Sequence, residues 1–172
     1  MKTKEKILIG ARDFLLKYGQ GGFTVRSVAN ESGVNQGLIH HYFGSKENLV
    51  LELIDYISIE PFERAKEMAK DVSKSEIKNV ILEVLLKNSQ LMNLLIEFFY
   101  FAQHSPTIKE KVKGVMKERR DFITEALEID EDEDKYLLNA AIFGAIFVNR
   151  IDDKVGVEKL LMKVFERFNL IG

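Results

Sequence analysis

The strongest constraint on the fold lies between Thr24 and Leu49, in the stretch TVRSVANESGVNQGLIHHYFGSKENL. Thr24 is a favourable helix cap, because its hydroxyl can accept a hydrogen bond from an otherwise unpaired backbone N–H. Gly33 stands where the helix over 25–32 must end, since glycine enters the left-handed conformation at little steric cost. A second short helix is expected over 35–42. The stretch therefore predicts two short helices joined by a tight turn.

The spacing of side chains assigns an inner and an outer face to these helices. Val28 and Ala29 are expected to point inward, as are Ile39 and Phe43 at positions i and i+4. The outer face carries groups that suit a DNA groove. Glutamine can bond adenine in bidentate fashion, an apolar side chain can contact a thymine methyl, and histidine or tyrosine can donate to phosphates. The pattern is typical of a DNA-reading helix-turn-helix, with an outer set of Asn35, Gln36, Leu38, His40 and His41.

A longer series of ordered landmarks surrounds this motif. They are Ile7, Ala11, Phe14, Leu15, Gly19, Phe23, Thr24, Val28, Ala29, Gly33, Val34, Gly37, Phe43, Ser45, Lys46, Glu47 and Leu49. With these landmarks, the segment from Ile7 to about Leu53 resembles the DNA-binding domain of the tetracycline-repressor (TetR) family of bacterial and archaeal regulators. The family usually has Tyr at the position of His40, and often Thr or Ser at that of Leu38.

The resemblance implies how the motif would meet DNA. Two copies of the helix over 35–42 would enter successive major grooves, about 34 to 36 Å apart, and bind a palindromic operator. The residues expected nearest the bases are Asn35, Gln36, Gly37, Leu38 and His41. The residues expected to hold the phosphate backbone are Thr24, Arg26, His40, Tyr42 and Lys46.

The charge is distributed unevenly along the chain. The whole chain of 172 residues has a net charge of −2, yet residues 1–50 carry seven Lys or Arg against four acids. Such asymmetry is the footprint expected of a small phosphate-facing head on a body that does not touch DNA, although chance unevenness would also produce it. There is no cysteine, and the N-terminal segment is too charged for a signal peptide. We therefore expect a cytoplasmic protein with no membrane contact.

Helical periodicity continues almost throughout, and no strand pattern competes with it. The predicted fold is all-α with about ten helices: a three-helix DNA-binding head over residues 1–44, and a helical effector-binding and dimerisation body over 45–172. Ser45 can cap the first helix of that body, and Pro61 stands where a helix would begin again. The expected body helices cover 45–58, 61–71, 75–87, 89–103, 106–128, 133–150 and 155–169.

The body contains many aromatic and apolar side chains, which could line a cavity or simply fill a core. The residues alone favour the core. The family resemblance favours a pocket for a small hydrophobic or aromatic molecule among the central helices. The candidate pocket residues are Met92, Ile96, Phe99, Tyr100, Gln103, His104, Met116, Phe122, Phe143 and Phe147.

A surface of small residues follows on the expected helix over 133–150. It could pack tightly within one subunit, but in the TetR family the last two helices usually form a dimer interface. The resemblance therefore implies a homodimer. Its expected interface residues are Ala141, Gly144, Ala145, Val148, Leu161, Val164, Phe165 and Phe168.

The function implied by the resemblance is a ligand-responsive repressor that a small molecule releases from DNA. The alternative is a DNA-binding protein of the same fold with no small-molecule effector, controlled by a protein partner. Neither a catalytic site, a cofactor nor a metal is expected. The alternating Asp130, Asp132 and Asp134 lack the glycine and the closing glutamate of a calcium loop and are better explained as acids at a helix start. The basic residues over 109–120 alternate with acids, which indicates a solvated helix face.

Overall fold

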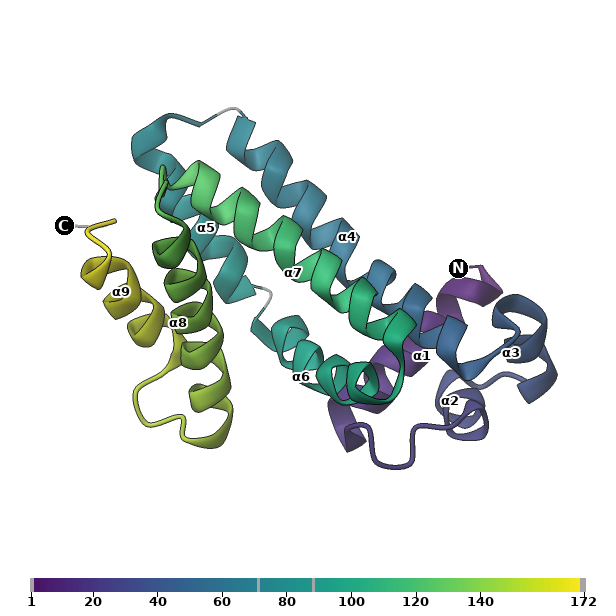
Figure 1. The fold of residues 1–172 in the computed structure, drawn as a ribbon. Helices are drawn as coiled ribbons and strands as arrows, with labels where there is room; N and C mark the ends of the chain where they lie inside the picture. Colours follow the sequence, from purple (N-terminus) through teal and green to yellow (C-terminus); the bar gives the residue numbers. More distant parts are fainter. Residues whose placement is uncertain (1, 71, 88, 171–172) are drawn as a thin grey trace. The chain divides into compact units, whose positions relative to one another are not determined.

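A computed structural model describes residues 2–70, 72–87 and 89–170, without the side chains of residues 59–61, 65, 74, 75 and 89–92. Within these ranges the chain forms nine α-helices and no strand, which confirms the predicted all-α fold (Figure 1). The helices divide between two compact units, each built from segments that are distant in the sequence.

The first unit contains the described residues of Met1–Ile59 and Leu94–Gly114. It holds α1 (Thr3–Tyr18), α2 (Val25–Ser32) and α3 (Gln36–Phe43) complete. It also holds the first part of α4 (Lys46–Lys70), the second half of α6 (Ser89–His104) and the first part of α7 (Pro106–Ala126). The second half of α6 thus packs in the same unit as the helix-turn-helix, although some 50 residues separate them in the sequence.

The second unit contains the described residues of Glu60–Asn93 and Val115–Gly172. It includes α5 (Lys74–Lys87), α8 (Asp132–Ile151) and α9 (Val157–Arg167). Its core is made of buried aliphatic and aromatic side chains from α5, α7, α8, α9 and the chain end. The members of this core are Ile81, Leu85, Ile123, Leu127, Leu138, Ile142, Ala145, Ile146, Leu161, Phe165 and Leu170.

The predicted break at Pro61 is wrong. One continuous helix, α4, runs from Lys46 to Lys70 in place of the two helices expected over 45–58 and 61–71, so nine helices are described rather than about ten. A proline inside a helix removes one backbone hydrogen bond. Packing on either side offsets this loss, because Leu53 is fully buried and the Phe62 ring packs against Phe122 with ring centroids 5.2 Å apart.

Candidate nucleic-acid interface

The start of α2 is fixed by a reciprocal pair of hydrogen bonds. The Ser27 backbone N–H donates to the Thr24 Oγ1 at 3.0 Å, and the Thr24 N–H donates to the Ser27 Oγ at 2.9 Å. These bonds satisfy two backbone donors that a helix start would otherwise leave unpaired. The predicted cap at Thr24 is therefore confirmed, and Ser27 is a partner that the sequence interpretation overlooked.

The turn between α2 and α3 is formed by Gly33, with φ 58° and ψ 44°. This left-handed conformation is costly for residues with a side chain, which explains glycine at this position. The Lys6 ammonium donates to the Gly33 carbonyl at 3.2 Å and so links α1 to the turn. The position of α3 relative to α2 is thus set by backbone geometry and by a contact with α1.

The inner faces of α2 and α3 are buried as expected. Val28, Ala29, Ile39 and Phe43 are each 3% exposed or less. Burial of these four side chains contributes the main apolar stabilisation of the motif. It leaves the opposite face of α3 free to meet a partner.

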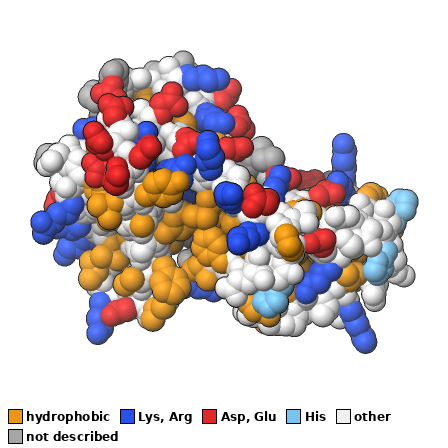
Figure 2. Space-filling model, viewed as in Figure 1, with side chains coloured by type: hydrophobic (Ala, Val, Ile, Leu, Met, Phe, Trp, Pro, Cys, Tyr) orange, Lys and Arg blue, Asp and Glu red, His pale blue; other side chains and the backbone are white. Residues whose placement is uncertain are grey.

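That outer face differs from the prediction in its first residue. Helix α3 covers Gln36–Phe43 instead of 35–42, and Asn35 is its cap, because the Asn35 Oδ1 accepts the Gly37 N–H at 2.8 Å. The side chain of Asn35 therefore has a structural bond of its own. Every residue predicted to meet DNA is exposed: Thr24, Arg26, Asn35, Gln36, Gly37, Leu38, His40, His41, Tyr42 and Lys46. Figure 2 shows histidine side chains on the surface over α3.

The residues proposed to hold phosphates have neighbours of their own in the unbound chain. The Lys46 ammonium lies 5.7 Å from the ring centroid of Phe23 and 5.4 Å from that of Phe101. The ring of His41 packs edge-on against Tyr42, with centroids 5.2 Å apart. The cationic and aromatic groups are thus partly ordered before any DNA arrives, which lowers the entropy lost on binding.

The candidate ligand residues are distributed over both units and do not form one described site. Ile96, Phe99, Tyr100, Gln103 and His104 belong to the first unit, whereas Met116, Phe122, Phe143 and Phe147 belong to the second. The Met92 side chain lies outside the described part. Phe99, Tyr100, Gln103, His104 and Phe147 are exposed, and Ile96, Met116, Phe122 and Phe143 are partly buried.

One open hollow in the second unit includes a candidate ligand residue. It has a volume of about 340 Å³ and is lined by Lys66, Ala69, Lys70, Phe122, Glu125 and Ala126. Phe122 is thus placed at a hollow of mixed apolar and charged character.

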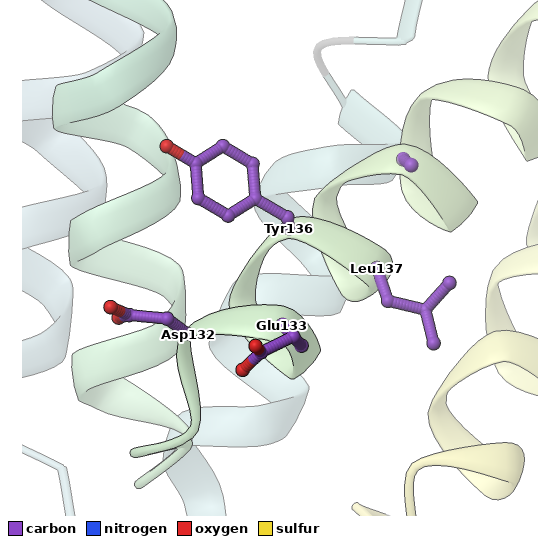
Figure 3. Close-up of a pocket in the computed structure, with 5 residues that line it drawn as sticks. Asp132, Glu133, Tyr136 and Leu137 are labelled. Atoms are coloured by element: carbon purple, nitrogen blue, oxygen red, sulfur yellow. The ribbon is translucent and has the colours of Figure 1, made fainter.

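A second hollow lies at the start of α8, with a volume of about 550 Å³. It is lined by Asp132, Glu133, Tyr136, Leu137 and Ala140, and Figure 3 shows Tyr136 and Leu137 projecting from α8 in different directions. The Arg120 guanidinium lies 4.3 Å from the Tyr136 ring centroid. Arg120 is therefore not part of a fully solvated face, as the alternating charges of α7 indicated.

Arg119, next to it on α7, lies 5.8 Å from the ring centroid of Phe143. Burial lowers the pKa of Arg119 to about 10, because a low-dielectric environment disfavours the charged form. The α7 sequence alone did not distinguish this arginine from the exposed basic residues around it.

The residues expected at a dimer interface fall into two groups. Ala145, Leu161 and Phe165 belong to the core of the second unit and are 9% exposed or less. Gly144 and Val148 are exposed on α8, and Ala141, Val164 and Phe168 are partly buried. Only the second group can offer surface to another molecule. Hydrophobic side chains gather in the part of Figure 2 that α8 occupies, and Leu137, Val148 and Ile151 of this helix are all more than half exposed.

In the described part of the chain, no helix is both long and apolar enough to cross a membrane. Among the same residues, no group of three or more His, Cys, Asp or Glu is placed to hold a metal ion. Asp132, one of the three alternating acids, instead pairs with Lys135 at 3.2 Å.

Comparison with known proteins identifies the N-terminal segment. Residues 7–53 match the family described as bacterial regulatory proteins, tetR family. The transcriptional repressor AcnR of Corynebacterium glutamicum is 36% identical over 83 residues, which cover 48% of this chain and 40% of AcnR. The transcriptional regulator QacR of Staphylococcus aureus is 28% identical over 116 residues, which cover 65% of this chain and 62% of QacR. The chain thus spans less than two thirds of either relative.

Solved structures resemble the fold over nearly the whole chain. A TetR transcription regulator from Haloarcula marismortui has a TM-score of 0.80 at 18% identity, covering 98% of this chain and 95% of that one. A transcriptional regulator from Saccharomonospora viridis in complex with choline has a TM-score of 0.82 at 16% identity, covering 96% and 95%. At such identities the likeness establishes the fold alone. Together with the match over residues 7–53, it shows that the chain belongs to the TetR family of bacterial regulatory proteins.

Proposed function

We propose that the chain is a DNA-binding transcriptional regulator, and specifically a ligand-responsive repressor. The observation that carries this proposal is the exposed outer face of α3, held between a capped helix start and the left-handed turn at Gly33. This motif lies inside the segment that matches the family. The residues on its exposed face can donate to bases and phosphates, whereas its inner face is fully committed to packing.

In the proposed complex, α3 enters the major groove and Gln36 bonds a base edge, with Gly37, Leu38 and His41 nearby. Arg26, Lys46 and Thr24 contact the phosphates on either side, together with His40 and Tyr42. Phosphate contacts fix the register of the protein, and base contacts select the sequence. The head over residues 1–44 would therefore supply both the affinity and the specificity for DNA.

The proposed active form is a homodimer that binds a palindromic operator. The exposed face of α8 supports this proposal, because open space surrounds the position that a β-carbon of Gly144 would occupy. A glycine with open space on an apolar helix face permits a second helix to approach closely. Two copies related by a two-fold axis would present two α3 helices to half-sites about one DNA turn apart.

Release from DNA is proposed to follow binding of a small hydrophobic or aromatic molecule in the body, residues 45–172. The apolar and aromatic composition of that part supports the proposal, and a structural neighbour contains bound choline. Such a ligand must bind the DNA-free arrangement more tightly than the DNA-bound one, since equal affinity for both would shift nothing.

Selection from a random duplex library tests the regulator proposal for an operator of any sequence. We expect the purified chain to enrich an inverted repeat whose half-sites are one helical turn apart. A panel of small apolar molecules, added to the selected complex, would then test for release. Release by a protein from the source cell, with no release by any small molecule, would favour the partner-controlled alternative. Failure to enrich any sequence would contradict a sequence-reading function.

A further inference from the structure

The turn between α1 and α2 is bound at its first residues by a side chain from α6. The backbone N–H of Gln20 donates to the Glu97 Oε2 at 2.8 Å. Glu97 is 9% exposed, so the carboxylate is largely shielded from water. Hydrogen bonds to a charged acceptor are stronger than neutral ones, and shielding strengthens them further. A contact across 77 residues of sequence thus holds the beginning of the turn.

The same face of α6 holds the end of the turn. Phe101 follows Glu97 by four residues, so the two side chains lie on one side of the helix. The rings of Phe101 and Phe23 have centroids 5.4 Å apart and are tilted by 59°, and Phe23 is 1% exposed. Phe23 immediately precedes the Thr24 cap of α2. One helical turn of α6 therefore contacts both ends of the turn that leads into the helix-turn-helix.

The backbone at Gly19 is shaped to allow this approach. Its φ of 67° and ψ of −165° lie in a region that is almost exclusive to glycine. A β-carbon on residue 19 would also come within 3.3 Å of the Glu97 Oε2. Gly19 thus does more than end α1, because it also lets the turn lie directly against the carboxylate.

We propose that Glu97 and Phe101 form a latch that positions α2 and α3 for DNA binding. The inference rests on the proposed DNA-binding function and deepens it. Through this latch, a shift of the second half of α6 acts directly on the start of α2 and does not need to pass through α4. Glu97 is a positioning residue in this account, because it acts on DNA only through the turn.

Four variants test the latch. Glu97→Ala removes the acceptor, and Glu97→Asp keeps the charge but withdraws the carboxylate by one methylene. Glu97→Gln removes the charge and keeps an oxygen that can accept the Gln20 N–H. Glu110→Ala is the matched control, since it removes a carboxylate from the surface of α7, where the side chain is 71% exposed. If Glu97→Ala does not fold, the Asp and Gln variants still decide.

The first readout is hydrogen exchange of the Gln20 amide, measured by NMR without DNA. We expect exchange to become roughly tenfold faster in Glu97→Ala and Glu97→Asp, and to stay near the wild-type rate in Glu97→Gln and in the Glu110→Ala control. The second readout is affinity for the selected operator. We expect it to fall several-fold in the Ala and Asp variants only, while affinity for random DNA stays unchanged.

Two results would overturn the latch. Unchanged Gln20 exchange in both the Ala and Asp variants would show that the bond does not hold the turn. Faster exchange with operator affinity equal to that of Glu110→Ala would show that the turn does not position α2 and α3. A wild-type chain without selective DNA binding would refute the proposed function, and with it the positioning role. That failure is distinguishable from a broken latch, because Gln20 exchange is measured in the absence of DNA.

Discussion

Gly10 of α1 and Ser32 of α2 are so close that a β-carbon at position 10 would lie 2.1 Å from the Ser32 Oγ and 2.8 Å from the Ser32 Cα. Ser32 cannot easily withdraw, because it is 5% exposed and its hydroxyl donates to the Val28 carbonyl at 2.7 Å. The crossing of α1 and α2 therefore depends on the absence of a side chain at position 10.

Gly10→Ala should therefore destabilise the chain, by about 1 to 3 kcal/mol, the usual cost of overpacking a closed contact. Gly114→Ala is its matched control, because Gly114 also lies inside a helix but has open space around the β-carbon position. That change should raise the free energy of unfolding by about 0.5 to 1 kcal/mol. Urea titration followed by circular dichroism measures both. Equal effects of the two substitutions would contradict the close packing of α1 on α2.

Gln36 is expected to select a base. Gln36→Ala should weaken binding to the selected operator by about 1 to 3 kcal/mol and leave binding to random DNA nearly unchanged. The physical reason is that a bidentate amide bond to adenine has no counterpart on the phosphate backbone. Anisotropy titrations with both duplexes separate the two effects. Equal losses on both duplexes would remove Gln36 from the set of base contacts.

Lys46 is expected to bind phosphate even though its ammonium lies near the rings of Phe23 and Phe101. Lys46→Ala should weaken binding to all duplexes alike and reduce the slope of log affinity against log salt by about one. Lys113→Ala is the control, because that ammonium lies on α7 with its side chain 74% exposed. A slope that is unchanged in Lys46→Ala would assign Lys46 to the aromatic contact alone.

Val148 is expected to lie in the dimer interface. Val148→Glu would place a charge in that interface, so the chain should become monomeric while its helical content is retained. Val155→Glu is the matched control, since Val155 is 51% exposed against 52% for Val148 but lies beyond the end of α8. Sedimentation equilibrium measures the assembly. Dimers that persist in Val148→Glu and dissociate in Val155→Glu would place the interface elsewhere.

Local chemistry is predictable from the sequence where one residue determines the backbone. Thr24, Gly33 and Ser45 are each expected at a helix boundary, and each lies at one. Such boundaries depend on hydrogen bonds between residues two to four positions apart, so a short window of sequence contains the information. The inward orientation of Ile39 and Phe43 follows in the same way from helical periodicity.

Features that depend on distant partners are not predictable in this way. Pro61 is expected to break a helix, yet α4 continues through it with packing on either side. Leu161 and Phe165 have the spacing of an exposed apolar stripe, but their own subunit buries them completely. The spacing of an apolar face does not indicate whether that face packs within the subunit or against another molecule. The bond between Gln20 and Glu97 has no sequence signal, because it joins a backbone donor to a residue far along the chain.

The most direct test of sequence-specific DNA binding is fluorescence anisotropy of the purified chain on DNA from beside its own gene, with random DNA as the control and salt varied. We expect tight, salt-sensitive binding to a site in that DNA, with affinity for random DNA lower by a factor of about 10³ or more. Equal affinity for both duplexes at every salt concentration would contradict the account. In that case the outer face of α3 would not be a sequence reader for that DNA.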